Sequence, residues 1–267
     1  MKEVRFFYCP DIASGFLPEE EARHALRVLR LGVGDELNLM DGRGSFFRAT
    51  ITATSGHRCA FAVEEQTAAE PEWSGHIHLA LAPTKNIDRI EWLTEKATEI
   101  GIDRLSLLNC QFSERTSVKT DRLERILVAA MKQSHKARLP QLDDMQRFSD
   151  FICQDNLPKM RFIAHCYEMD DVGGGTKPLL SDLLLKPQSL LRGLHPPLGG
   201  LGASENLSTE TPSFLVLIGP EGDFSVDEVR AAHAHGFRSV SLGTSRLRTE
   251  TAALTAVHLM RLAASCP

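Results

Sequence analysis

The stretch that decides the fold is residues 213–262, SFLVLIGPEGDFSVDEVRAAHAHGFRSVSLGTSRLRTETAALTAVHLMRL. It begins with an apolar run at 214–218, which predicts a buried strand and stops at the loop 219–223, GPEGD. Ser225 and Glu228 follow with the S-x-x-E spacing of a capping box, in which side chain and main chain satisfy the free amides that begin a helix. The first part of the stretch therefore predicts a strand, a glycine-bearing loop and a helix.

The second part of the stretch repeats this unit. A run at 237–242 predicts another strand, Gly243 ends it, and the loop 244–248 leads into an apolar helix at 249–262. Two such units in succession predict adjacent parallel strands joined by crossover helices. Because ligands of such sheets bind beyond the carboxyl ends of the strands, both loops are expected to border a ligand site.

Strands and helices also alternate upstream of this stretch. Runs at 77–82, 102–108 and 161–167 predict strands, and helical spacing follows the first two. The alternation predicts an α/β domain with a mainly parallel sheet over residues 73–267. His165, at the end of the last of these strands, could line the cleft, but a structural histidine is the preferred interpretation.

Residues 172–212 have a different composition, rich in glycine, proline and leucine. Loops of this length are uncommon inside compact domains. The segment is therefore expected to be a long surface insertion with one short helix at 181–185 and to be otherwise disordered.

Residues 1–72 predict a separate small domain, and Pro71-Glu72 is the expected linker. Short strand patterns on both sides of a glycine turn at 41–44 indicate a mostly β, barrel-like domain with one helix that begins after Pro18. Many small barrels bind RNA, but a fold alone does not establish that function.

Basic residues gather at two places. Three arginines share one face of the N-terminal helix, and a basic run ends the helix that begins at Thr120. Stacked arginines suit phosphate oxygens, whereas the alternative is an ordinary solvated helix face. The candidate RNA contacts are Arg23, Arg27, Arg30, Lys132, Lys136 and Arg138.

The composition excludes several classes of protein. No apolar run approaches the length of a membrane span and the N-terminus has no signal-peptide pattern, so a cytoplasmic protein is expected. Neither cysteines nor histidines have metal-ligand spacing, and no metal is expected. The dinucleotide, P-loop and G-x-S-x-G motifs are absent, which disfavours a doubly wound nucleotide-binding enzyme and a serine hydrolase.

Charged residues cluster at the second loop of the C-terminal stretch. Arg246, Arg248 and Glu250 lie where a parallel sheet would expose its carboxyl edge, which favours a functional site over packing. The alternative is an ion-pair network within the chain around Glu250. The first loop, GPEG, taken alone favours a plain turn over a ligand site, and the second glycine loop shifts that balance toward a ligand site.

Taken together, these motifs resemble the RsmE family of ribosomal RNA methyltransferases, in the SPOUT superfamily. The resemblance is spread over nearly the whole chain. Its motifs are Arg27-Val28-Leu29-Arg30, Glu95–Gly101, Ser113–Thr116, Gln133-Ser134 with Pro140, Ile218–Gly222, and Leu242-Gly243 with Leu247–Ala252. Asp223 departs from the family, which commonly has glycine there.

The resemblance implies a PUA-like N-terminal domain that grips RNA and a C-terminal parallel sheet whose chain forms a deep trefoil knot. It implies a homodimer that binds S-adenosylmethionine in the knot and methylates N3 of a uridine in small-subunit (16S) ribosomal RNA. The implied cofactor-binding residues are Leu217, Gly219, Pro220, Gly222, Leu242, Gly243 and Leu247.

The resemblance also implies that Arg248 and Glu250 face the methyl donor and the target base. Uridine N3 lies on the pairing edge, so the base has to be unpaired or turned out before it can react. Arg248 is expected to stabilise negative charge on the uracil oxygens, and Glu250 to orient Arg248 or to receive the N3 proton. The competing interpretations are a related methyltransferase that acts on another rRNA or tRNA base, and a non-catalytic RNA-binding protein.

Overall fold

The computed structural model of the protein describes residues 4–173, 175–185 and 211–265. The chain forms two compact units, one of residues 1–72 with 121–140 and one of residues 73–120 with 141–267. The predicted boundary after residue 72 coincides with the first break. Residues 121–140, however, group with the N-terminal unit, where the sequence analysis assigned them to the second domain. Main-chain bonds account for this, since Gly44 N donates to Ala137 O and Leu139 N donates to Gly42 O, each at 2.9 Å.

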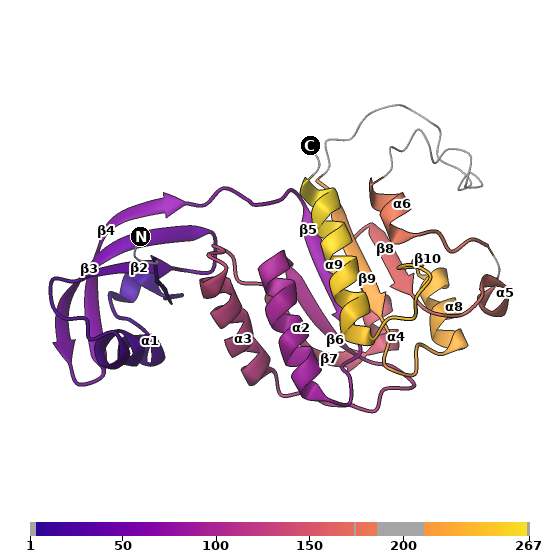
Figure 1. Ribbon diagram of the computed structural model, residues 1–267, viewed down its shortest axis with the longest axis horizontal. Helices are drawn as coiled ribbons and strands as arrows, with labels where there is room; N and C mark the ends of the chain where they lie inside the picture. Colours follow the sequence, from indigo (N-terminus) through magenta and orange to yellow (C-terminus); the bar gives the residue numbers. More distant parts are fainter. Residues whose placement is uncertain (1–3, 174, 186–210, 266–267) are drawn as a thin grey trace. The chain divides into compact units, whose positions relative to one another are not determined.

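The N-terminal unit is built on a four-stranded sheet in the order β1-β2-β3-β4 (Figure 1). β1 is parallel to β2, and the remaining pairs are antiparallel. Its core combines alternate residues of these strands with Ala22 and Ala25 of the helical segment. The bounds are β1 Phe6–Tyr8, η1 Ile12–Ser14, α1 Glu19–Arg23, η2 His24–Val28, β2 Glu36–Met40, β3 Ser45–Ser55, β4 Arg58–Ala68, and, from the inserted part, α3 Thr120–Gln133.

The predicted stack of arginines on one helix face is wrong in part. After α1 the chain continues as the π-helical segment η2, in which Leu29 N donates to His24 O at 3.1 Å. The wider turn changes the spacing of side chains around the axis. Arg30 lies beyond the helix in the left-handed region, with φ 59°. Arg23, Arg27 and Arg30 are all exposed, but they do not form one row.

The second unit is built on a six-stranded sheet, all of it parallel, in the order β10-β8-β9-β5-β6-β7. The predicted α/β class is confirmed. The bounds are β5 His76–Leu81, α2 Ile87–Ile100, β6 Arg104–Asn109, β7 Gln141–Arg147, α4 Phe148–Ile152, β8 Met160–Ala164, α5 Met169–Val172, α6 Leu180–Leu185, β9 Ser213–Ile218, α8 Val226–Ala234, β10 Arg238–Val240 and α9 Thr249–Ser265.

The two C-terminal strands are parallel as predicted, but they are not neighbours. β9 and β10 each pair with β8, which lies between them. The crossover through α8 therefore passes over β8, and the loops that follow all three strands leave from the same edge of the sheet. Two of these loops were expected at this edge from the sequence, and the third begins at His165.

Helices cover both faces of this sheet. α2 and α9 pack on each other, and α9 contacts β5 and β9, whereas α8 packs on α4, α5 and β10 (Figure 1). The predicted capping box is present, because Glu228 N donates to Ser225 Oγ at 3.2 Å and Ser225 N donates to Glu228 Oε2 at 2.8 Å. Within the described ranges, no helix is both long and apolar enough to cross a membrane.

The predicted insertion at 172–212 is partly integrated into the sheet unit. The expected short helix is α6, and Leu180 and Leu183 on it are 0% and 7% exposed. Leu179 forms a parallel bridge with Ser241, beside the second C-terminal loop. Residue 174 and residues 186–210 lie outside the described residues, and the predicted trefoil knot stays a prediction.

Candidate active site

A cavity of about 830 Å³ lies at the carboxyl edge of the sheet, next to the ends of β8, β9 and β10. Its volume is within the range of small-molecule sites in proteins, roughly 300–1,000 Å³. Its walls come from three loops, from Arg89 on α2, from Lys177, and from the first turns of α9. Both glycine-bearing loops border this cavity, and Gly219 and Leu247 line the same space, as a shared ligand site requires.

The loop after β9 is shaped by a close approach of main chain to itself. A Cβ on Gly219 would lie 3.1 Å from both the ring and the amide nitrogen of Phe224, so a larger residue would push the loop apart. Phe224 is fully buried and packs on Phe148, with ring centroids 5.4 Å apart. In the chain between Gly219 and Phe224, Asp223 adopts φ 68°, a left-handed conformation that few non-glycine residues take. The loop is thus fixed by the core beneath it.

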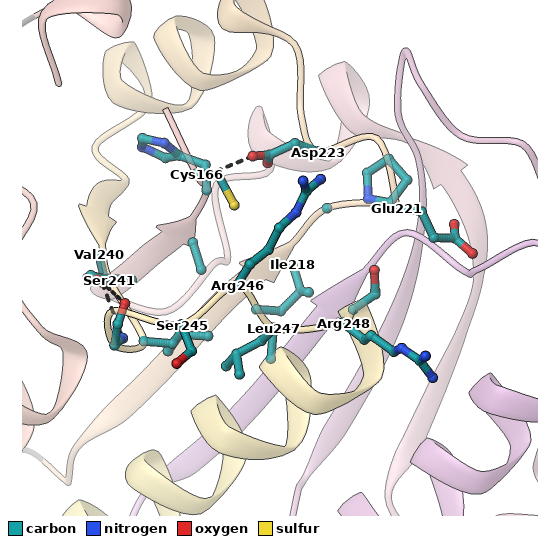
Figure 2. Close-up of a pocket in the computed structure, with 18 of the residues that line it drawn as sticks. Cys166, Ile218, Glu221, Asp223, Val240, Ser241, Ser245, Arg246, Leu247 and Arg248 are labelled. Carbon is teal, nitrogen blue, oxygen red and sulfur yellow. Dashed lines mark hydrogen bonds between the residues drawn. The ribbon is translucent and has the colours of Figure 1, made fainter. Parts of the chain in front are cut away.

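The loop after β10 contributes main chain and three long side chains to the cavity. Gly243 has φ 134°, which only glycine adopts readily. Leu242 and Leu247 give apolar walls, while Arg246 and Arg248 are exposed. In Figure 2 the guanidinium of Arg246 reaches toward Asp223 and Cys166, and that of Arg248 points to the opposite side. The two arginines therefore serve different parts of the site.

The loop after β8 forms a third wall of the cavity, and of its residues the sequence had offered only His165 as a possible lining residue. His165, expected to be structural, is 7% exposed and donates to or accepts from Ser239 Oγ through Nε2 at 2.7 Å, yet it also lines the cavity. Burial, and then the neighbouring Lys177, lower its pKa to about 4, so the ring is neutral at physiological pH. Lys177 Nζ donates to Tyr167 O at 2.6 Å, which fixes its ammonium group at this end. No sequence motif marked either residue.

Glu250 is placed differently from the prediction. It is 8% exposed at the start of α9 and is not among the lining residues. Its Oε1 lies 3.7 Å from Nη1 of Arg89, so its ion-pair partner is Arg89, where the sequence analysis proposed Arg248. Its Oε2 is buried and has no hydrogen-bond partner among the described residues. A buried carboxylate oxygen without a partner is costly, which marks the position for a functional role.

Of the predicted cofactor-binding residues, some line the cavity and some do not. Gly219, Pro220, Leu242, Gly243 and Leu247 line the cavity. Leu217 does not, because its side chain is fully buried in the core under β9. Gly222 does not either, and its role is steric, since a Cβ there would lie 3.3 Å from Cβ of Phe112.

The predicted RNA-contact residues all lie in the N-terminal unit, and they differ in whether their charged groups are already paired. Lys132 Nζ lies 2.6 Å from Glu21 Oε1, and Lys136 Nζ lies 2.8 Å from Glu72 Oε2 with only 9% of its side chain exposed. Both ammonium groups therefore already have carboxylate partners. Arg138 is exposed and donates from Nη1 to Arg43 O at 3.1 Å.

Comparison with known proteins defines the class. Residues 71–191 and 194–261 match the family described as RNA methyltransferase domain, and residues 17–64 match the RNA methyltransferase PUA domain. The first match alone covers more than half of the chain, which therefore belongs to the RNA methyltransferase family. The resemblance to the RsmE family and the PUA-like character of the N-terminal unit are confirmed.

Individual relatives cover nearly the whole chain. A crystal structure of a probable rRNA-methyltransferase from Porphyromonas gingivalis is 39% identical, covers 98% of both chains and superimposes with a TM-score of 0.78. The ribosomal RNA small subunit methyltransferase E of Rickettsia conorii is 26% identical over 92% of this chain and 88% of its own. The enzyme of that name from Neisseria gonorrhoeae, solved with S-adenosyl methionine bound, is 23% identical over 97% and 98%, with a TM-score of 0.73, and shows the shared fold.

Proposed function

We propose that this chain transfers a methyl group from S-adenosylmethionine to N3 of a uridine in 16S ribosomal RNA. The observation that carries the proposal is the cavity at the sheet edge, which joins apolar walls and loop main chain to an exposed arginine, Arg248. Membership of the RNA methyltransferase family supports the type of reaction, and the relatives named for the small-subunit enzyme support the type of substrate.

The residues present fit S-adenosylmethionine. Ile218, Leu242 and Leu247 form an apolar wall suited to a nucleoside, and loop main chain beside Gly219 and Gly243 offers hydrogen-bonding groups to a flat base. The cofactor supplies an electrophilic methyl group on sulfur. The loops hold the donor in one orientation, and such positioning contributes much of the acceleration in transfer reactions.

Arg248 is the proposed catalytic residue. Loss of the N3 proton leaves negative charge on the uracil oxygens, and a fixed guanidinium stabilises that charge best in a site closed to water. Arg248 reaches away from the Asp223 side of the cavity, so it is available to a base that enters from that direction (Figure 2).

Glu250 is proposed to act with Arg89. The pair places a carboxylate with one unpartnered oxygen behind an arginine that lines the cavity. Glu250 either orients Arg89 toward the target base or receives the N3 proton through Arg89-bound water. Glu250→Gln distinguishes these roles, because an orienting amide would retain part of the rate and its pH profile, whereas a proton acceptor would not.

The PUA domain is proposed to hold the RNA. The target uridine has to be turned out of its stack to reach the cavity, so RNA contacts outside the cavity have to secure its flanks. Arg23, Arg27, Arg30 and Arg138 remain candidates for phosphate contact. Lys132 and Lys136 are left out because their ion-paired side chains are mostly buried, whereas the ion pair of Arg23 with Glu19 is exposed. RNA affinity should then fall steeply as salt concentration rises.

The assembled enzyme is proposed to be a knotted homodimer that works in the cytoplasm. The knot and the dimer follow from the resemblance to the RsmE family, and the cytoplasmic location follows from the composition of the chain. Light scattering of the purified chain tests the dimer, and a single monomeric species at micromolar concentration would refute it.

The decisive experiment maps methylated uridines in 16S rRNA from cells that lack this protein. Wild-type protein should restore one N3-methylated uridine, while Arg248→Ala should restore none and should bind S-adenosylmethionine within a few fold of wild type. Arg230→Ala is the matched control, because Arg230 is an exposed arginine on α8 outside the cavity. A missing methyl group in tRNA or in another rRNA position would favour the related methyltransferase, and an unchanged modification pattern would favour a non-catalytic RNA-binding protein.

A further inference from the structure

One end of the cavity carries charges that the proposed chemistry has not used. Asp223 and Arg246 come from different loops and face this end together, beside Cys166 (Figure 2). The apolar residues Ile218 and Leu247 lie away from it. A carboxylate and a guanidinium that border one space are the two groups that would bind an α-amino acid zwitterion, the first through its ammonium group and the second through its carboxylate.

The Asp223 carboxylate is fixed before any ligand binds. Oδ2 accepts a hydrogen bond from Cys166 N at 2.7 Å, and Oδ1 accepts one from Phe224 N at 2.8 Å. An ionised carboxylate accepts about four hydrogen bonds, so both oxygens keep capacity for a ligand. The side chain is half-buried and lines the cavity, which places that remaining capacity within reach of a ligand.

The backbone conformation at Asp223 indicates that its carboxylate has a functional role. With φ 68°, glycine would be the least strained residue at this position. Strained conformations at the edge of a binding site persist where the side chain contributes to function. Burial, and then the charge of Asp223, raise the pKa of the neighbouring Cys166 thiol.

We infer that Asp223 binds the α-ammonium group of the cofactor's methionine moiety, with Arg246 placed to receive the α-carboxylate. The inference rests on the proposed function, since it takes S-adenosylmethionine as the ligand. It makes Asp223 a specificity residue that distinguishes the complete cofactor from adenosine compounds without the amino acid. Lys177 also lines the cavity, and its ammonium group already donates to the Tyr167 carbonyl at 2.6 Å.

The test compares two thioethers by isothermal titration calorimetry. S-adenosylhomocysteine carries the amino acid moiety and 5′-methylthioadenosine lacks it, and neither has a sulfonium charge. In Asp223→Asn the affinity for S-adenosylhomocysteine should fall about 10- to 100-fold, the effect of losing one charge-assisted hydrogen bond, while the affinity for 5′-methylthioadenosine changes less than about twofold. Asp223→Gly should show the same selective loss of affinity for S-adenosylhomocysteine. It relieves the backbone strain at φ 68° but removes the acceptor of the Cys166 and Phe224 amides, so its fold is checked by circular dichroism.

Glu168→Gln is the matched control, since Glu168 is an exposed carboxylate of the same cavity that the inference does not use. It should leave both affinities unchanged. Equal weakening of both ligands in the Asp223 variants would mean that Asp223 only shapes the loop, and would overturn the inference. Loss of affinity for S-adenosylmethionine without loss for S-adenosylhomocysteine would assign Asp223 to the sulfonium and overturn it as well. Wild-type protein that binds none of the three compounds would overturn the proposed function itself.

Discussion

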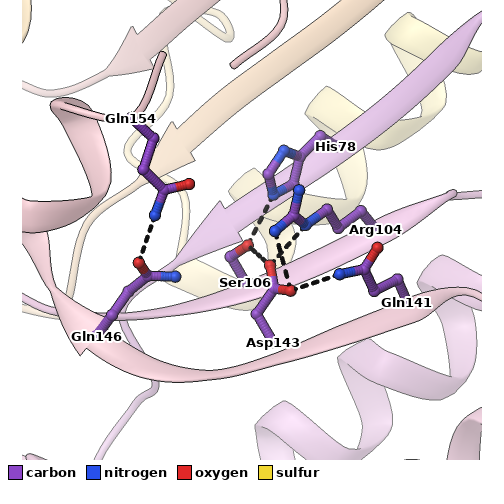
Figure 3. Close-up of polar contacts among 7 residues, drawn as sticks. All are labelled: His78, Arg104, Ser106, Gln141, Asp143, Gln146 and Gln154. Carbon is purple, nitrogen blue, oxygen red and sulfur yellow. Dashed lines mark hydrogen bonds and ion pairs between the residues drawn. The ribbon is translucent and has the colours of Figure 1, made fainter. Parts of the chain in front are cut away.

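His78 should make the sheet domain sensitive to mild acid. Its side chain lies on β5, is 1% exposed and forms a 2.7 Å hydrogen bond between Nε2 and Ser106 Oγ (Figure 3). Burial, and then the charge of Arg104, lower the pKa of His78 from 6.5 to about 3. The folded protein therefore keeps this ring neutral at a pH where the unfolded chain protonates it.

The sign and size of the effect follow from proton linkage. Between pH 6.5 and pH 3 the unfolded state binds one proton more at His78, so the free energy of unfolding decreases as the pH falls. From about pH 7 to about pH 5 the loss should be about 2 kcal/mol. Asp143, the other titrating group of the cluster, does not interfere. Burial raises its pKa, but hydrogen bonds from Arg104 and Ser106 outweigh burial and hold the pKa below 3.8. Its contribution is therefore lost only in stronger acid.

Urea unfolding followed by tryptophan fluorescence measures this domain alone, because both tryptophans, Trp73 and Trp92, lie in the sheet unit. The matched variant is His78→Gln, whose amide nitrogen can replace Nε2 toward Ser106 without titrating. The variant should lose about 2 kcal/mol less than wild type over the same pH interval. His165 and His233 also have lowered pKa values, but they titrate in both proteins and cancel in the comparison. Equal acid sensitivity of the two proteins would refute the reasoning.

Two further predictions concern the core and the cavity. Phe224→Ala should lower the free energy of unfolding by about 3–5 kcal/mol in urea titrations, because it removes a fully buried ring beneath the cavity loop. The control Phe112→Ala, at a residue 46% exposed, should lower it by less than about 1 kcal/mol, and similar losses in the two variants would contradict the packing argument. S-adenosylmethionine should slow the alkylation of Cys166, which lines the cavity, and should not change the alkylation of the exposed Cys153. Mass spectrometry of the peptides measures both rates, and equal protection of both cysteines, or of neither, would count against the site.

The pattern of apolar residues predicted most of the elements correctly. Strands β5, β6, β8 and β9 and the helices that follow two of them bury continuous or periodic apolar side chains, and such patterns are local properties of the sequence. β7 was missed because its sequence, QLDDMQR, has neither an apolar run nor alternation. It is held at the sheet edge by a bidentate ion pair, in which Arg104 Nε and Nη2 lie 2.7 and 3.1 Å from the carboxylate of Asp143. That partner lies on another strand, so no local pattern could reveal it.

For the candidate site, the sequence by itself indicated two of the three loops that border the cavity. The glycines at 219 and 243 and the arginine at 248 are required where main chain turns sharply and where charge is exposed, and these are demands on single residues. Only the tertiary structure decided which strands are neighbours and which side chains are in contact. It inserted β8 between β9 and β10 and paired Glu250 with Arg89. It also brought Asp223 and Arg246 to one end of the cavity. Strand order depends on crossover connections between distant segments, and the energy that selects it is spread over the whole core, so it leaves no signature in any short stretch of the chain.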